Sequence, residues 1–399
     1  MAGQELRSRT LRRWLLGLGP LGLLAALVAV FLVYDPTSVM KTSFPPVEEL
    51  TIERVTLPSP GVLEVHVVNG GPAPVTVAQV LVDEAYWEHE IDGDRTLQRL
   101  GRRTLTVPYP WVEGEPHEIA LITSTGLTFT HEVEVATVTP QPSARFFAVF
   151  ALLGIYVGVL PVLIGLLWSP FLREVGKRWT HFFLSVTIGL LVFLGVDALD
   201  EALETAAAVP DAFQGVGLVL IGVVASVAAL RILGGATGSG RDESMDPMAV
   251  RLRLSYLVAI GIGLHNLGEG LAIGAAFSLG EIAFGSFLII GFAIHNTTEG
   301  LAIVAPVATD RPPVKHYLGM GALAGLPTIL GTWIGGFSYS PIAATVFLAL
   351  GVGAILQVVL EIGRMLRREA PGGVLAPLNA AGLTLGLVLM YGTALLVVA

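Results

Sequence analysis

The sequence has no cysteine and little charge. Of its 399 residues only 14% are Asp, Glu, Lys or Arg, whereas soluble domains average about 25%. Without cysteine the chain has no disulfide framework, no thiolate metal ligand and no cysteine nucleophile. The formal net charge of −9 argues against a nucleic-acid partner, which requires a basic surface. The chain is 53% hydrophobic, and its long apolar windows predict an integral membrane protein.

The first apolar run, residues 14–34, is long enough to cross a membrane and follows a group of arginines. A secretory signal peptide also begins with basic residues and an apolar run. Here the run is longer, and Tyr34-Asp35-Pro36 lacks the small-residue pattern of a cleavage site. We therefore interpret residues 1–35 as a cytoplasmic basic tail followed by an uncleaved transmembrane anchor. The arginines are Arg7, Arg9, Arg12 and Arg13.

Residues 36–141 alternate between apolar and polar side chains over short runs, such as Leu63-Glu64-Val65-His66-Val67. Turn signals such as Asn69-Gly70-Gly71-Pro72 separate these runs. Six or seven strands at this spacing predict an antiparallel all-β sandwich of immunoglobulin-like type. The histidines of this part have no metal-ligand spacing in the sequence, so we interpret them as ordinary strand or surface residues. They are His66, His89, His117 and His131.

Eight apolar windows of membrane-spanning length divide residues 142–399 and predict an α-helical bundle. Lysine and arginine lie in the odd-numbered loops between the windows, and the even-numbered loops have none. Because positive charge marks the cytoplasmic side, we expect the N-terminus inside and both the sandwich and the C-terminus outside. We place this multi-pass protein in a plasma (inner) membrane. The windows are 146–168, 182–206, 216–232, 254–279, 282–307, 318–337, 342–366 and 374–398.

The fourth and fifth windows contain the same short motif, 30 residues apart. The fourth has His265-Asn266-Leu267-Gly268-Glu269-Gly270, and the fifth has His295-Asn296-Thr297-Thr298-Glu299-Gly300. In each motif the glutamate follows the histidine by four positions, so on a helix the imidazole and the carboxylate share one face. The asparagine next to each histidine lies about 100° round the helix and reaches a neighbouring position.

A carboxylate at the centre of a bilayer costs about 2.5–3.5 kcal/mol or more. One divalent cation neutralises two glutamates, and two imidazoles complete a four-ligand shell of nitrogen and oxygen. Such ligands suit Zn²⁺, Fe²⁺ or Mn²⁺, and the lack of sulfur disfavours Cu⁺. A single His or Glu in a membrane helix is often only a hydrogen-bonded packing residue, but two matched copies favour a metal site. Gly270 and Gly300, directly after the glutamates, should let the two motif helices approach closely.

The doubled His-Asn-x-x-Glu-Gly motif on the fourth and fifth of eight spans resembles the ZIP (Zrt-, Irt-like) divalent metal transporters, especially the bacterial zinc-uptake type. The resemblance covers residues 146–399 and excludes the anchor and the sandwich. It implies a metal site midway across the membrane, often with two ions. The resemblance assigns one ion to His265, Glu269, His295 and Glu299. It assigns a second ion to Asn266 and Asn296, with the two glutamates bridging.

This chain departs from the family pattern at several positions. Family members commonly have proline before each motif glutamate, where this chain has Gly268 and Thr298. Many members have a glutamate in the sixth span at the position of Thr328, and some have aspartate at the position of Asn296. Because these negative charges are missing, we expect a second ion to bind weakly or not at all.

Acidic residues form a stripe on the second span, near its expected outward end. Asp197, Asp200 and Glu201 follow one face, and Glu204 continues it. A cleft lined by one sign of charge raises the local concentration of counter-ions. We expect the first three to line a cation entrance. For all except Asp197, which lies deeper, ordinary charge at a membrane edge is the alternative interpretation.

The seventh span has one polar pair near its expected cytoplasmic end. Gln357 and Glu361 share a helix face at a spacing of four residues. Two interpretations of Glu361 remain open at this point: it lines the exit for the ion, or it pairs with Arg364 or Arg368.

These observations predict a divalent cation transporter that brings Zn²⁺, or alternatively Fe²⁺ or Mn²⁺, into the cytoplasm by alternating access. The chain has no P-loop for ATP, so an ion gradient would drive transport. The metal is substrate, and we expect no organic cofactor and no enzymatic activity. Divalent metal ions and membrane lipid are the expected partners. A monomer and a homodimer are both compatible with the sequence, and the sandwich's partner is unknown.

Two alternatives belong to other functional classes. A metal-sensing or scaffold membrane protein would use the sandwich as its working part. An intramembrane zinc hydrolase would use the histidines and glutamates for catalysis. The hydrolase is disfavoured because His-x-x-x-Glu differs from the His-Glu-x-x-His arrangement, in which two histidines hold zinc and the glutamate is the base.

Overall fold

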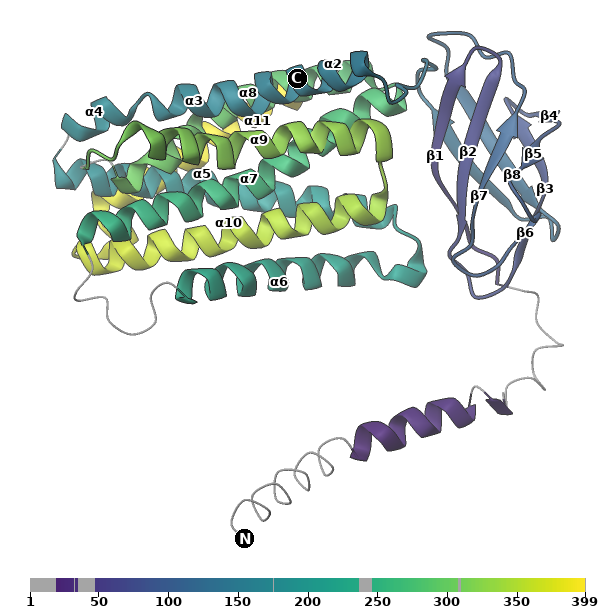
Figure 1. Cartoon of the computed structure of the whole chain (residues 1–399), viewed down its shortest axis with the longest axis horizontal. Coiled ribbons are helices and arrows are strands. Elements are labelled where there is room, and N and C mark those ends of the chain that lie inside the picture. Colours follow the sequence, from purple (N-terminus) through teal and green to yellow (C-terminus); the bar gives the residue numbers. More distant parts are fainter. Residues whose placement is uncertain are drawn as a thin grey trace. The chain divides into compact units, whose positions relative to one another are not determined.

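The computed structural model describes residues 19–31, 33–34, 47–174, 176–236, 246–307 and 310–398. The chain forms two compact units, residues 1–47 and 48–399. In the first unit, Gly19–Phe31 is an apolar helix (Figure 1) whose side chains are exposed. The arginines predicted to precede the anchor lie outside the described residues.

The predicted strands form two antiparallel sheets (Figure 1). One sheet has the order β1-β2-β7-β5, and the other has the order β4-β3-β8-β9, with β6 paired to β3. The strands are β1 (Leu50–Ser59), β2 (Val62–Asn69), β3 (Val75–Val82), β4 (Ala85–Trp87), β5 (Glu90–Ile91), β6 (Thr96–Leu97), β7 (Arg102–Val107), β8 (His117–Thr123) and β9 (Thr128–Val133).

The alternation in β2 shows why these residues form strands. Leu63, Val65 and Val67 are at most 1% exposed, whereas Glu64 and His66 between them are half-buried. Successive side chains of a strand point to opposite faces, so the first three enter the core. Val77 and Leu121 from the other sheet belong to the same cluster of buried side chains. The two sheets therefore share one core.

Eight helical segments among the described residues are long and apolar enough to cross a membrane, as the eight windows predicted, and this indicates a multi-pass membrane protein. The first span consists of α2 (Ala144–Gly154), the π-helical segment η1 (Ile155–Val159), α3 (Leu160–Leu166) and α4 (Ser169–Glu174). The others contain α5 (Lys177–Ala207), α6 (Gly215–Ala236), α7 (Pro247–Leu279), α8 (Ile282–Val304), α9 (Val314–Ser338), α10 (Pro341–Glu369) and α11 (Pro377–Val398). Among the described residues, the short 3₁₀ segments are η2 (Asp211–Phe213), η4 (Ala305–Val307) and η5 (Gly373–Leu375).

The spans pack in two groups that run side by side (Figure 1). In one group α7 packs against α9, α3 against α8, and α7 against α8. In the other group α5 packs against α10 and α11, and α6 packs against α10. The groups meet where α7 contacts α10 and where α8 contacts α11. The two motif helices thus belong to the same group and lie at its border with the other.

The two motif glycines pack differently from the sequence-based expectation. A Cβ atom on Gly270 would overlap the carbonyl oxygen of Thr328 on α9, and one on Gly300 would overlap that of Val162 on α3. The glycines therefore allow close packing of α7 on α9 and of α8 on α3, and the expected role between α7 and α8 is wrong. The reason is angular, because a residue directly after the glutamate lies about 100° away from the face that bears it.

Candidate metal centre

Each motif helix, α7 or α8, bears the histidine and the glutamate of its motif on the same face. His265 and Glu269 lie one turn apart on α7, and His295 and Glu299 lie one turn apart on α8. All four side chains are buried, with exposed fractions of 5%, 2%, 7% and 3% in the order of the chain. Both helices continue without interruption through the motifs, so they stay regular at Gly268 and Thr298.

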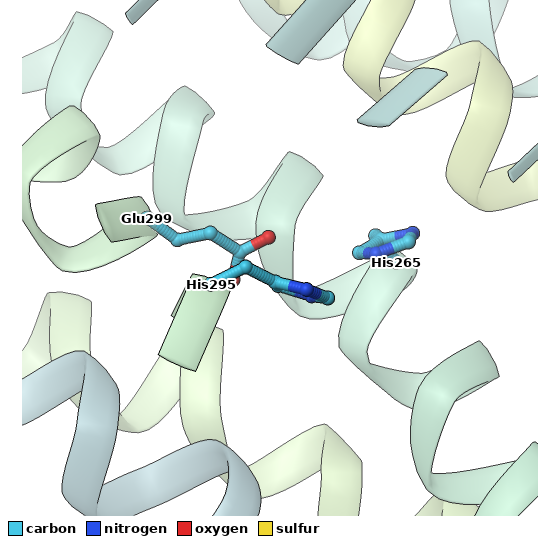
Figure 2. A group of neighbouring side chains, drawn as sticks. All are labelled: His265, His295 and Glu299. Carbon is cyan, nitrogen blue, oxygen red and sulfur yellow. The ribbon is translucent and has the colours of Figure 1, made fainter. Parts of the chain in front are cut away.

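Three of these side chains form a group that fits a metal ion. His265, His295 and Glu299 each offer one ligand atom, and these atoms all lie within 4.8 Å of one another. Figure 2 shows His295 and Glu299 extending from one helix, with the imidazole of His295 directed toward His265 on the other. Nitrogen and carboxylate oxygen at such spacing match the ligands that Zn²⁺ and similar ions prefer.

Glu269 connects the two motifs. Its Oε1 atom accepts a hydrogen bond of 3.2 Å from His265 Nε2 and also accepts one from His295 Nε2. Its Oε2 atom accepts a hydrogen bond of 2.9 Å from the Asn296 amide. The carboxylate therefore holds both imidazoles, whereas the three-ligand group found among the described residues does not include Glu269.

The two asparagines anchor the motif helices to their neighbours. Asn266 Nδ2 donates to the carbonyl of Ala324 on α9 at 3.1 Å, and Asn296 Nδ2 donates to the carbonyl of Val157 in η1 at 3.0 Å. Pro161, four residues after Val157, has no N–H to offer that carbonyl. Asn296 supplies the missing donor, as intramembrane helices require when proline interrupts their hydrogen bonds. The carbonyl partners were missed by the sequence reasoning, although Pro161 was an available signal.

Several buried oxygen atoms of this region have no hydrogen-bond partner among the described residues. They are Asn266 Oδ1, Asn296 Oδ1, both carboxylate oxygens of Glu299, and Thr328 Oγ1. Thr328 is fully buried and lies one helical turn after Ala324, on the same face of α9. Buried polar atoms are almost always paired. A cation is the ligand that a set of acceptor oxygens without donors would satisfy.

The acidic stripe of α5 has one member near the centre. Asp197, Asp200 and Glu204 are exposed, and Glu201 is half-buried. Glu201 interacts electrostatically with His265 and with Glu269. Within the stripe, Glu201 is thus the residue with a described electrostatic link to side chains of the metal centre, and the cation entrance stays a prediction.

The polar pair of α10 separates into two environments. Gln357 is 6% exposed, and its Oε1 atom has no hydrogen-bond partner among the described residues. Glu361 accepts a hydrogen bond of 2.8 Å from Arg364. Glu361 was expected either to line the exit for the ion or to pair with an arginine, and the structure shows the pair with Arg364.

The histidines of the sandwich have other partners. His66 lies 3.1 Å from the hydroxyls of Thr56 and Thr104, and His117 Nδ1 lies 2.8 Å from Asp83 Oδ2. Burial, followed by the charge of Arg54, lowers the pKa of His66. Among the residues that the structure describes, the group of three or more metal-type ligands is found at α7 and α8 and includes no histidine of the sandwich.

Comparisons with known proteins leave this site to be judged on its chemistry. Neither the models of known protein families nor the curated proteins contain a match for this chain. The donor set and its packing therefore carry the functional argument.

Proposed function

We propose that this protein is a divalent metal cation transporter that carries Zn²⁺, with Fe²⁺ and Mn²⁺ as competing substrates, into the cytoplasm. The observation that supports this most strongly is the convergence of His265, His295 and Glu299 within 4.8 Å, inside two helices long enough to span a membrane. The ion is cargo that the site binds and releases.

The energetics of burial support a cation at this position. Glu269 and Glu299 are both nearly fully buried, and a carboxylate costs several kcal/mol to bury without compensation. Glu269 obtains donors from two imidazoles and one amide. Glu299 accepts no hydrogen bond from an imidazole, and its polar neighbour is the neutral amide of Asn266, so a divalent ion is its natural counter-charge.

Ion binding at this site involves displacement of protons. An imidazole nitrogen that coordinates a metal must offer a lone pair, whereas a nitrogen that donates to Glu269 carries a proton. Coordination through Nε2 of either histidine therefore requires that proton to leave or move to Nδ1. Glu269 lies beside both nitrogens and is placed to accept it.

The packing of the spans supports a ZIP-like architecture. The motif helices α7 and α8 form one group with α3 and α9, and this group borders α10 and α11. Movement of one helix group against another around a central site is the usual basis of alternating access.

The strand order of the sandwich supports the immunoglobulin-like assignment. The order β1-β2-β7-β5 corresponds to strands ABED of one immunoglobulin sheet, and β4-β3-β8-β9 contains the C–F–G order of the other.

The charge pattern supports a direction for the ion. The basic odd-numbered loops favour a cytoplasmic location for the start of α7 and the end of α10. Glu201 lies on α5 toward the opposite end, where Asp197 and Asp200 add negative charge. We therefore assign the outer approach to the acidic stripe, with Glu201 as its least exposed carboxylate, and place the sandwich outside the cell.

One ion per chain fits the available charge. Asn266, Asn296 and Thr328 contribute unpaired but neutral oxygens. A second divalent ion beside the first would have to share the carboxylates already used. We therefore propose that a second ion binds weakly.

The decisive experiment is uptake of ⁶⁵Zn²⁺ into proteoliposomes by the full chain and by Glu269→Gln and Glu299→Gln variants. Saturable uptake that both substitutions abolish, with Mn²⁺ and Fe²⁺ competing, is the expected result. Glu174→Gln removes an exposed carboxylate at the end of α4 and should leave uptake unchanged. A wild type that binds zinc but moves none would refute the transporter and favour the sensor or scaffold alternative.

A truncated chain tests whether transport requires the sandwich, as the scaffold alternative predicts. A chain that lacks residues 1–141 should still transport zinc if the helical bundle alone is the carrier. Loss of transport in a correctly folded truncated chain would show that the sandwich is a working part of the protein.

A further inference from the structure

A pocket of about 290 Å³ lies between α7 and α10, away from the metal centre. It is found where α7 begins and α10 ends, so the two helices run in opposite directions along it. Four arginines contribute to its lining, two from each helix. They are Arg251, Arg253, Arg364 and Arg368.

Two of these arginines already have partners. Arg251 donates two hydrogen bonds of 2.7 Å to the carboxylate of Asp310. Arg364 donates one of 2.8 Å to Glu361. Each of these ion pairs neutralises the positive charge of one arginine in the pocket lining.

Arg253 and Arg368 have no hydrogen bond or ion pair among the residues that the structure describes. Arg253 is half-buried and Arg368 is exposed, so Arg253 is the more enclosed of the two. The remaining carboxylate, Glu369, lies 3.6 Å from His181 Nε2 of α5. Two unpaired guanidinium groups that face one cavity form a site for an oxygen anion, because guanidinium matches phosphate oxygens in pairs.

The rest of the lining is apolar. Val250, Leu254 and Leu257 follow the same face of α7 into the helix, and Met365 lies opposite on α10. A charged end and an apolar continuation match the phosphate headgroup and the acyl chains of a phospholipid. Arg253 and Arg368 leave unpaired positive charge in this lining, so the pocket is unsuited to zinc.

The geometry points to a binding site for the phosphate of an anionic phospholipid of the cytoplasmic leaflet, held by Arg253 and Arg368. Basic pockets between transmembrane helices on the cytoplasmic side are a recurring form of anionic lipid recognition. The site lies where the two helix groups meet, because α7 belongs to one and α10 to the other. A bound lipid would contact both groups at once. The inference stands independently of metal transport.

The test is lipid binding to the purified, delipidated full chain in detergent, measured by native mass spectrometry. The probes are dioleoylphosphatidylglycerol, dioleoylphosphatidylcholine and inorganic phosphate. The wild type should bind the phosphatidylglycerol tightly and the phosphatidylcholine weakly. The double variant Arg253→Gln/Arg368→Gln should bind phosphatidylglycerol about 10- to 30-fold less tightly. This factor is expected because each of the two basic residues contributes a similar share of the affinity for an anionic lipid.

A control pair removes the same charge elsewhere on the same expected membrane side. Arg178→Gln/Arg367→Gln changes two exposed arginines that do not line the pocket and should weaken binding less than about threefold. Arg253→Lys/Arg368→Lys keeps the charge but loses the paired guanidinium geometry, so an intermediate loss is expected. This variant also serves if the glutamine pair fails to fold.

Three outcomes would overturn the site. The pocket variant could bind phosphatidylglycerol as tightly as the wild type, or the control pair could lose as much affinity as the pocket pair. Inorganic phosphate could bind the wild type and displace the lipid at equal concentration, which would assign the pocket to a soluble anion. Selective phosphatidylglycerol binding that only the pocket variants weaken supports the lipid site.

Discussion

Asn296 donates a hydrogen bond of 2.9 Å to Glu269 across the contact between α8 and α7. The same amide nitrogen also donates to Val157 in η1. One neutral side chain thus orients the carboxylate that holds both imidazoles and ties it to a third segment. Groups that orient metal ligands in this way usually affect metal affinity strongly.

We expect Asn296→Ala to weaken zinc binding by about 10- to 100-fold, because Glu269 loses a donor and a fixed orientation. Competition against a zinc chelator in detergent measures this dissociation constant. Asn379→Ala is a matched control, since Asn379 is a buried asparagine of α11 that donates to Gly373. Equal zinc affinity in wild type and Asn296→Ala would remove Asn296 from the centre.

Adding a charge at the same position should increase the number of bound ions. Asn296→Asp places a second carboxylate beside Glu269, and a cation relieves the repulsion between them. We expect about one zinc per chain in the wild type and a second equivalent in the variant, as divalent sites gain affinity with each added negative ligand. Metal analysis after gel filtration measures the ratio. A wild type that already holds two ions would contradict the charge argument.

The close packing of α8 on α3 should depend on the absence of a Cβ atom at residue 300. Gly300→Ala adds a methyl group that overlaps Val162 and Gly165, so we expect destabilisation of about 1–3 kcal/mol. Gly392→Ala is the matched control, because a Cβ there meets nothing within 4 Å. That change should stabilise the helix by up to about 1 kcal/mol. Thermal unfolding in detergent compares the two, and equal Tm values would contradict the packing.

Acid should weaken the sandwich through Asp83. Burial alone would raise the pKa of Asp83, but hydrogen bonds from Tyr109 and His117 and from the backbone of Glu118 outweigh it and lower this pKa. The same contact, after burial, raises the pKa of Tyr109 to about 12. A lowered carboxyl pKa stabilises the fold at pH values above the ordinary value of about 4, and that contribution is lost as the pH falls through the folded-state pKa.

Pulse proteolysis of the full chain at pH 7 and at pH 3 tests this contribution. Asp83→Asn should be less stable than the wild type at pH 7, and the difference should shrink at pH 3, because the unfolded chain then binds a proton at Asp83 more readily than the folded chain with its lowered pKa. Asp94→Asn changes an exposed carboxylate of the same sandwich and should show no such convergence. A difference that stays constant with pH would show that the charge of Asp83 does not stabilise the sandwich.

Local periodicity made much of this protein predictable. A spacing of four residues fixes one helix face, so the placement of each histidine and the following glutamate on the same face followed from sequence alone. The eight spans followed from window length. The alternation of Leu63, Val65 and Val67 with polar residues similarly predicted a half-buried strand.

Contacts between elements were harder to predict from the sequence. The sequence suggested that Gly270 and Gly300 face each other, and the structure places them against α9 and α3. The electrostatic link of the half-buried Glu201 to His265 and Glu269 was also not foreseen. A rotation of one residue turns a side chain by about 100°, so small uncertainties in helix orientation decide which neighbour is reached.

By itself, the sequence determined the kinds of element and the side chains that share a face within each, because those depend on residues a few positions apart. Only the tertiary structure decided that Glu269 would hold both imidazoles and that Asn296 would bind the carbonyl that Pro161 leaves without a donor. Those contacts join residues 26 and 139 positions apart. They depend on how whole helices pack, which no local repeat specifies.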